Sequence, residues 1–189
     1  MTLSSDQATE SLKEIDRTER RSAQAYRYAY SSPFFVMWGV IWVAGYGGSD
    51  LYPHDAGSIW MALTVLGFLG SVAIGRQRAR IGQQHPGMNR YASWRFLASF
   101  ITMGCFVMAT FALFGHAGWR QQAAFVPLLI AMFYTLVGLW AGLRFVITGI
   151  AVAVLTMGGF FFLPAHFLLW MAAVGGGALI LAGLWMKKI

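Results

Sequence analysis

The hydrophobic residues of this chain gather in long runs that short polar segments separate. The longest run extends from Phe145 to Met186 and contains no Asp, Glu, Lys or Arg, with His166 as its only ionisable side chain. One crossing of a bilayer core needs about 20 apolar residues, so we interpret this run as two crossings. Pro164 cannot continue a helix ladder and is the expected turn.

Four further apolar runs precede this hairpin, and Ser32 followed by Pro33 predicts a helix start, with Ser as N-cap and Pro at the first position. The fold class we predict is all-α, a polytopic membrane protein. Residues 33–189 are expected to form a six-transmembrane-helix bundle behind a cytoplasmic N-terminal helix in residues 1–32. The expected spans are about 33–50, 58–75, 94–115, 123–143, 145–163 and 166–186.

The N-terminal segment is polar and holds five of the seven acidic residues. It lacks the apolar core of a secretory signal, and its salt-bridge spacings predict an amphipathic helix over about residues 5–30. This helix is either a solvated lead-in or a docking surface for a cytoplasmic protein. The candidate docking residues are Leu12, Ile15, Arg17, Arg20, Arg21 and Tyr26.

The distribution of cations predicts the orientation. Thirteen of the fourteen Lys and Arg fall in the termini or in loops that six spans place on one side, and only Arg120 falls on the other. Cations favour the cytoplasmic side, so both termini are expected in the cytoplasm and the protein in the plasma (inner) membrane. Composition agrees, because 58% of residues are hydrophobic and only 11% charged, against about 25% charged in soluble domains. The net charge of +7 is therefore not interpreted as a nucleic-acid surface.

Small residues recur at helical spacing within the spans, where they let helix backbones approach one another in lipid. Such faces predict contacts between helices, and they leave a homo-oligomer open. The expected packing residues are Gly67, Ser71, Gly75, Gly138, Gly142 and Gly176.

No catalytic motif, phosphate-binding loop or metal-ligand spacing is present, so we predict neither an enzyme nor a cofactor. The single cysteine, Cys105, excludes a disulfide framework. The expected outer loops nevertheless share imidazoles and carboxylates, which suit a metal ion or proton sensing. These weak metal candidates are His54, His116, His166, Asp50 and Asp55.

The segments FFVMWGVIWVAGYG, YTLVGLWAGLRFVITG and FLLWMAAVGGGALILAGLWMKK are similar to those of uncharacterised small bacterial six-span membrane proteins. The resemblance covers most of the chain from Phe34 onward. It implies a role beside a transcription regulator, as its membrane partner, and it transfers no site residue.

The sequence leaves three functions open. The first hypothesis is a regulatory or sensory membrane protein that binds a cytoplasmic partner through residues 5–30. The second is a passive channel or carrier for a small neutral or apolar solute, since no span contains a mid-membrane charge of the kind that ion-coupled pumps use. The third is a metal-handling protein built on the outer histidines.

Overall fold

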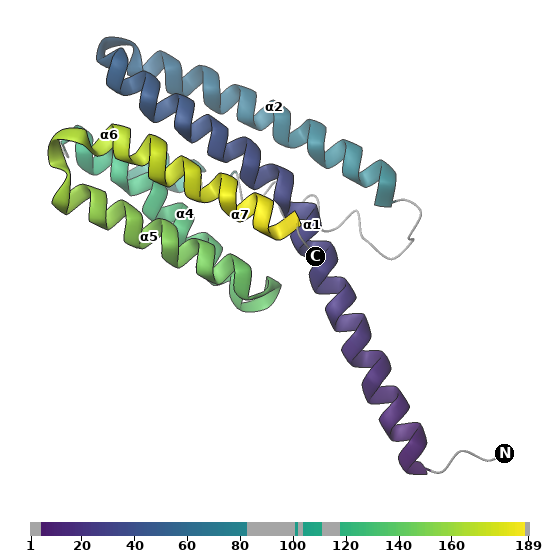
Figure 1. Cartoon of the computed structure of the whole chain (residues 1–189). Coiled ribbons are helices and arrows are strands. Elements are labelled where there is room, and N and C mark those ends of the chain that lie inside the picture. The colour runs from purple at the N-terminus through teal and green to yellow at the C-terminus, as the bar shows by residue number, and fades with distance from the viewer. Residues whose placement is uncertain (1–4, 83–100, 102–103, 111–117, 188–189) are drawn as a thin grey trace.

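The computed structural model describes residues 5–82, 101, 104–110 and 118–187, and every element in these ranges is helical (Figure 1). The all-α prediction is thereby confirmed for this part of the chain. The elements are α1 (Ser5–Leu51), η1 (Pro53–Asp55), α2 (Ala56–Gly82), α4 (Trp119–Ala141), α5 (Leu143–Phe162), η2 (Pro164–His166), α6 (Phe167–Trp170), the π-helical turn η3 (Met171–Gly176) and α7 (Gly177–Lys187).

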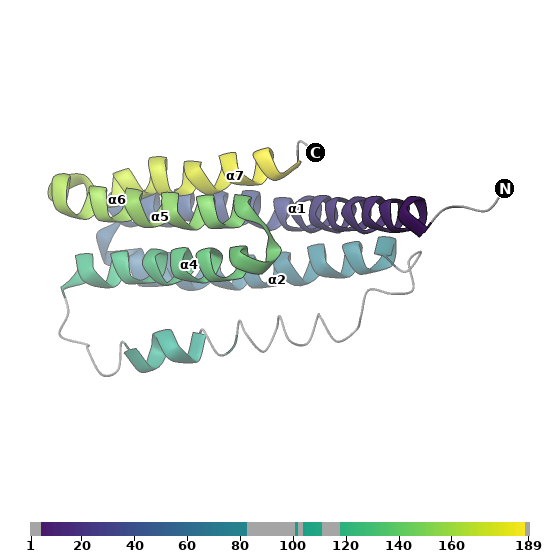
Figure 2. The same cartoon turned by 90° about the horizontal axis from the view of Figure 1, so that it is seen from below.

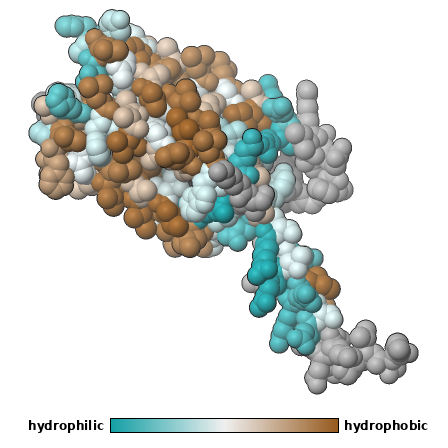
Figure 3. Space-filling model, viewed as in Figure 1, coloured by the Kyte–Doolittle hydropathy of each residue, from teal (hydrophilic) through white to brown (hydrophobic). Residues whose placement is uncertain are grey.

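Four helical stretches are long and apolar enough to cross a membrane, namely Pro53–Arg78, Trp119–Ala141, Leu143–Phe162 and Pro164–Lys187. The last two form the expected hairpin, in which α5 ends before Leu163 and the chain turns through η2. Figure 3 shows that hydrophobic residues dominate the visible bundle surface, while the part of α1 outside the bundle is mostly hydrophilic. This division is that of a multi-pass membrane protein.

The other two expected spans, residues 33–50 and 94–115, are not confirmed. Residues 33–50 form the C-terminal part of α1, which is not among the four stretches. Trp, Tyr and Gly occupy many of its positions, for example Trp38, Trp42 and Tyr46, and these residues lower the hydropathy of a run that still packs inside the bundle. Most of residues 94–115 lies outside the described ranges. A bundle of six spans therefore stays a prediction.

The helix start expected at Pro33 is wrong, because α1 runs without a break from Ser5 to Leu51 and contains Pro33 in its interior. An interior proline costs a helix about 3 kcal/mol, and tertiary contacts on both sides of it offset this cost. Ser32 does not cap the helix; its Oγ donates to the Gly183 carbonyl of α7 at 2.7 Å. Phe35, one turn later, is 3% exposed.

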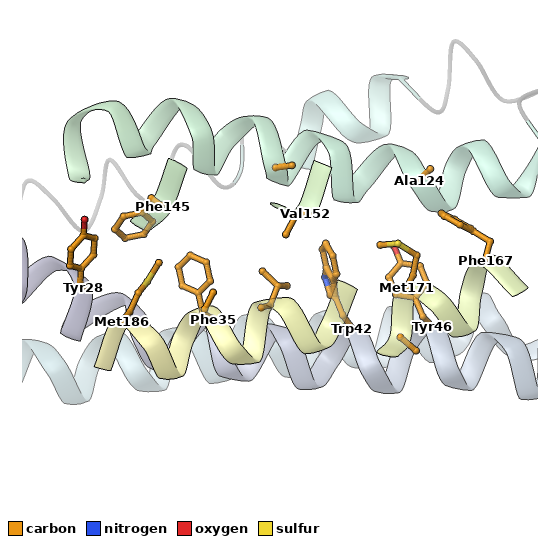
Figure 4. Packing of buried hydrophobic residues seen from close by; sticks show 14 residues of the cluster. Tyr28, Phe35, Trp42, Tyr46, Ala124, Phe145, Val152, Phe167, Met171 and Met186 are labelled. Atoms are coloured by element: carbon orange, nitrogen blue, oxygen red, sulfur yellow. The ribbon is translucent and has the colours of Figure 1, made fainter. Parts of the chain in front are cut away.

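The C-terminal part of α1 lies at the centre of the bundle, beside α2 on one flank and beside η3 and α7 on the other (Figures 1 and 2). Helices α4 and α5 form a second hairpin, and α5 also contacts α7. The space between these layers is filled by a row of large side chains along the bundle axis (Figure 4). Its labelled members include Tyr28, Phe35, Trp42, Val152, Met171 and Phe167.

Most of the expected packing residues lie at helix contacts. A Cβ on Gly67 would meet the Trp38 ring and Ile41 of α1, and the Ser71 Oγ lies 3.3 Å from the Trp38 Nε1 that donates to it. Gly138 lies against the backbone of α5 and Gly176 against that of α1. Gly75, in contrast, faces open space among the described residues.

Candidate functional site

The two turns α1–α2 and α5–α6 lie at the same end of the bundle (Figure 1), which we name the turn end. His54 in η1 and His166 in η2 are both exposed there. Asp55 is also exposed and Asp50 is half-buried, while His116 lies outside the described residues. Within the described ranges no three His, Cys, Asp or Glu side chains are placed to hold a metal ion, so this part of the chain lends the metal hypothesis no support.

Arg120, the one cation expected on this side, links two helices at the turn end. From the first turn of α4 its Nη2 donates to the Phe160 carbonyl of α5 at 2.6 Å. Its guanidinium carbon also lies 4.8 Å from the centroid of the Phe160 ring, a cation–π distance. These contacts give Arg120 a structural role.

At the opposite end α1 leaves the bundle. We name residues 5–23 the α1 extension, and every side chain described within it is exposed. Leu12 is 67% and Ile15 55% exposed, and Arg17 and Arg21 are exposed as well, whereas the side chain of Arg20 is outside the described part. The extension therefore presents apolar and charged groups together to the surroundings.

The extension meets the bundle where α1 passes the α4–α5 turn and the ends of α2 and α7, and we name this region the basic end. Tyr26 stacks on Tyr30 with ring centroids 6.2 Å apart. Burial raises the pKa of Tyr30, the nearby Tyr26 raises it further, and Arg78 of α2 lowers it. The Tyr30 phenol is therefore neutral at physiological pH and available as a hydrogen-bond donor.

The α4–α5 turn is held by a tyrosine from α1. Gly142 between the two helices has φ +134°, a backbone conformation that favours glycine. The Tyr28 hydroxyl, packed beside this turn, accepts a hydrogen bond from the Arg144 backbone N–H at 3.3 Å and one from the Gln24 Nε2 at 2.9 Å. The Tyr28 ring is 5% exposed and lies 5.6 Å from the Phe145 ring, so Tyr28 fixes the base of the extension to α5.

The Arg144 side chain completes this junction. Its Nη1 donates to the Trp185 carbonyl of α7 at 2.6 Å. Its guanidinium carbon lies 4.7 Å from the Trp185 ring centroid and 5.3 Å from that of Tyr28. One cation thus joins α1, α5 and α7 where the extension meets the bundle.

An open hollow of about 330 Å³ lies beside this cation. It is lined by Gln24, Ala25, Tyr28, Leu143, Arg144, Ile147 and Trp185. One guanidinium and one amide face apolar and aromatic walls, and none of the described lining residues carries a carboxylate. A hollow of this composition suits a small anionic group with an apolar attachment. The sequence did not point to it, because Tyr28 and Arg144 are 116 positions apart.

Together, these features define an all-helical protein with four helices suited to crossing a membrane and a polar helix that extends from the bundle. The chain matches no protein-family model, no curated protein and no solved structure. The resemblance to small bacterial six-span membrane proteins remains an expectation.

Proposed function

We propose that this chain is a regulatory or sensory membrane protein whose α1 extension binds a cytoplasmic protein. The observation that carries the proposal is the continuity of α1, which is one helix from the exposed extension to the centre of the bundle. A partner bound to the extension is therefore joined to the membrane domain by helical backbone. No observation in the described residues favours the carrier or the metal-handling hypothesis.

The junction supports transmission of force or position between the two parts. Tyr28, Ser32 and Phe35 follow one another at three- and four-residue spacing, and each is at most 5% exposed. They contact α5 and α7, so movement of the extension is passed to these helices. Packed interfaces respond to such movement by switching between discrete arrangements.

The chemistry of the extension indicates the type of partner. Leu12 and Ile15 are three positions apart and form a narrow apolar stripe, since residues three or four apart share a helix face. Charges of both signs flank this stripe, including Glu14 and Arg17. A narrow stripe with mixed flanking charges suits a second helix that packs lengthwise, as in coiled coils. We therefore expect a helical segment of a cytoplasmic protein as the partner.

The proposed location follows from the cations at the basic end. Arg76, Arg78, Arg144 and Lys187 all lie in the elements that meet there. Such residues are enriched on the cytoplasmic side of membrane proteins, which supports an extension, and termini, in the cytoplasm.

Site-specific photocrosslinking tests the proposal. A photoreactive amino acid at Leu12 or Ile15 should capture one defined cytoplasmic protein in intact cells. The same group at Glu10, which is exposed and which helical spacing places on the opposite face, should not capture it. Equal capture from both faces, or no capture from Ile15, would contradict the proposal.

Deletion of residues 2–20 provides the complementary experiment. Every side chain described within residues 2–20 is exposed, whereas a deletion reaching residue 30 would also remove the buried Tyr28. The shortened protein should keep its melting temperature in detergent and lose the crosslinked partner. Retention of the partner by the shortened protein would show that the bundle itself binds it.

A further inference from the structure

The hollow beside Arg144 has the composition of a ligand site, and it is independent of the protein partner proposed above. We propose that this hollow binds the phosphate headgroup of an anionic phospholipid, with Arg144 and Gln24 as its polar contacts. Three features support this assignment: the hydrogen-bonding capacity of the two side chains, the apolar surface that continues from the hollow, and the position of the hollow at the basic end.

The polar groups can hold a phosphate. A guanidinium carries five N–H donors, and among the described residues Arg144 uses its Nη1 toward the Trp185 carbonyl. Its Nε and Nη2 are left for a ligand, and the fork geometry of arginine suits phosphate oxygens. Gln24 Nε2 has two hydrogens, one of which goes to the Tyr28 hydroxyl. Since none of the described residues that line the hollow is acidic, the charge of Arg144 is available to an anion.

The apolar wall identifies the ligand as a lipid rather than a free phosphate. Leu143, Ile147 and Trp185 line the hollow and are 65%, 45% and 40% exposed. Two further exposed residues, Ile150 and Val154, continue from Ile147 along α5 at helical spacing. This stripe leads from the hollow toward the middle of the bundle, in the direction that an acyl chain takes from a headgroup.

The charge of the hollow favours an anionic headgroup over a zwitterionic one. A choline group is normally held on aromatic faces, but the Arg144 guanidinium already lies over both Tyr28 and Trp185. The expected cytoplasmic leaflet is also where anionic lipids meet basic pockets between transmembrane helices. Because Gln24 and Tyr28 belong to α1, a bound lipid would contact the base of the extension.

Native mass spectrometry of the detergent-purified full chain tests the proposal. The probes are phosphatidylglycerol, phosphatidylcholine with the same acyl chains, and soluble glycerol 3-phosphate. We expect the wild-type protein to bind phosphatidylglycerol at least about tenfold more tightly than either other probe. Arg144→Gln and Gln24→Glu should each weaken that binding about tenfold, since a hydrogen bond to a charged group is worth about 1.5–3 kcal/mol.

Arg120→Gln is the matched control, because Arg120 also pairs a carbonyl hydrogen bond with a cation–π contact but lies at the turn end. It should leave phosphatidylglycerol binding unchanged. If Arg144→Gln fails to fold, Gln24→Glu decides the question, because Gln24 is a partly exposed residue whose contact with Tyr28 a carboxylate can also make.

Three outcomes would overturn the proposal. Undiminished binding by the folded Arg144→Gln protein, or by Gln24→Glu where it decides, would remove the site. Equal binding of both lipids would remove the preference for an anionic headgroup. Equally tight binding of glycerol 3-phosphate would make a soluble phosphate the ligand. None of these results bears on the protein partner, which the photocrosslinking experiment tests separately.

Discussion

At the scale of single residues, glycines decide how closely α1 approaches the last span. A Cβ on Gly39 would lie 2.9 Å from the Gly176 carbonyl oxygen, and a Cβ on Gly176 would lie 2.9 Å from the Gly39 carbonyl oxygen. Seven residues away on each helix, Ser32 faces Gly183 in the same way. The two helices are antiparallel, and these pairs form a seam of close backbone contact, which lipid-embedded helices use in place of hydrophobic burial.

Substitution within the glycine run 175–177 provides a matched test of this seam. Gly176→Leu should destabilise the bundle by about 1–3 kcal/mol, because the added side chain meets the α1 backbone and overpacks the contact. Gly177→Leu should be close to neutral, since a Cβ there has nothing within 4 Å among the described residues. The measurement is thermal unfolding in detergent. Equal effects of the two substitutions would show that this register of α1 against the last span is incorrect.

At the scale of the element, α1 is a single helix that continues through Pro33 from the polar extension into the bundle. Pro33 has no N–H to donate to the Ala29 carbonyl, so one helical hydrogen bond is missing at the point where the helix enters the bundle. The contacts of Tyr28 and Phe35 hold both sides of that position. The missing hydrogen bond at Pro33 and the packed side chains of Tyr28 and Phe35 therefore lie within two helical turns of each other.

Pro33→Ala should stabilise the protein, by up to about 3 kcal/mol, because alanine restores the missing donor and has the best helix propensity. The melting temperature in detergent measures this change. Pro127→Ala in α4 is the comparison: Pro127 is also inside a helix but fully buried, so the loss of its packed ring should offset the restored hydrogen bond. A fall in stability for Pro33→Ala would mean that the ring contacts matter more than the hydrogen bond.

At the scale of the whole molecule, the two ends of the bundle differ in chemistry. The basic end holds Arg76, Arg78, Arg144 and Lys187. At the turn end, Arg120 is the only Lys or Arg among the described residues, and it binds Phe160. Exposed His54 and His166 also lie at the turn end. This asymmetry is the basis of the proposed orientation, in which the extension lies in the cytoplasm.

Cysteine accessibility tests the orientation in intact cells, starting from a Cys105→Ser protein. An impermeant thiol reagent should label Ser58→Cys and Gln121→Cys from outside, because both positions are exposed near the turn end. Gln77→Cys at the basic end should be labelled only after the cells are broken. Ser49 is unsuitable, since it is buried and donates to the Gly45 carbonyl. Labelling of Gln77→Cys in intact cells would show that the orientation is the reverse of the proposed one.

The sequence by itself determined that the described chain is helical and where its last hairpin turns. In lipid, every backbone polar group must be satisfied within the segment, so an apolar run twice the bilayer thickness has to form two helices, and Pro164 marks the break. The polar character of the first 32 residues follows from composition in the same way. These conclusions need only local properties of the chain.

Only the tertiary structure decided that α1 continues through Pro33, that Tyr28 meets Gly142 and Arg144, and that Gly176 rather than Gly177 faces α1. The reason is that a hydropathy pattern distinguishes residues that favour water from residues that avoid it, and nothing finer. In a membrane both the lipid-facing and the core-facing sides of a helix are apolar, so the sequence pattern does not distinguish them. The faces, and the hollow at Arg144, are set by contacts between residues far apart in the chain.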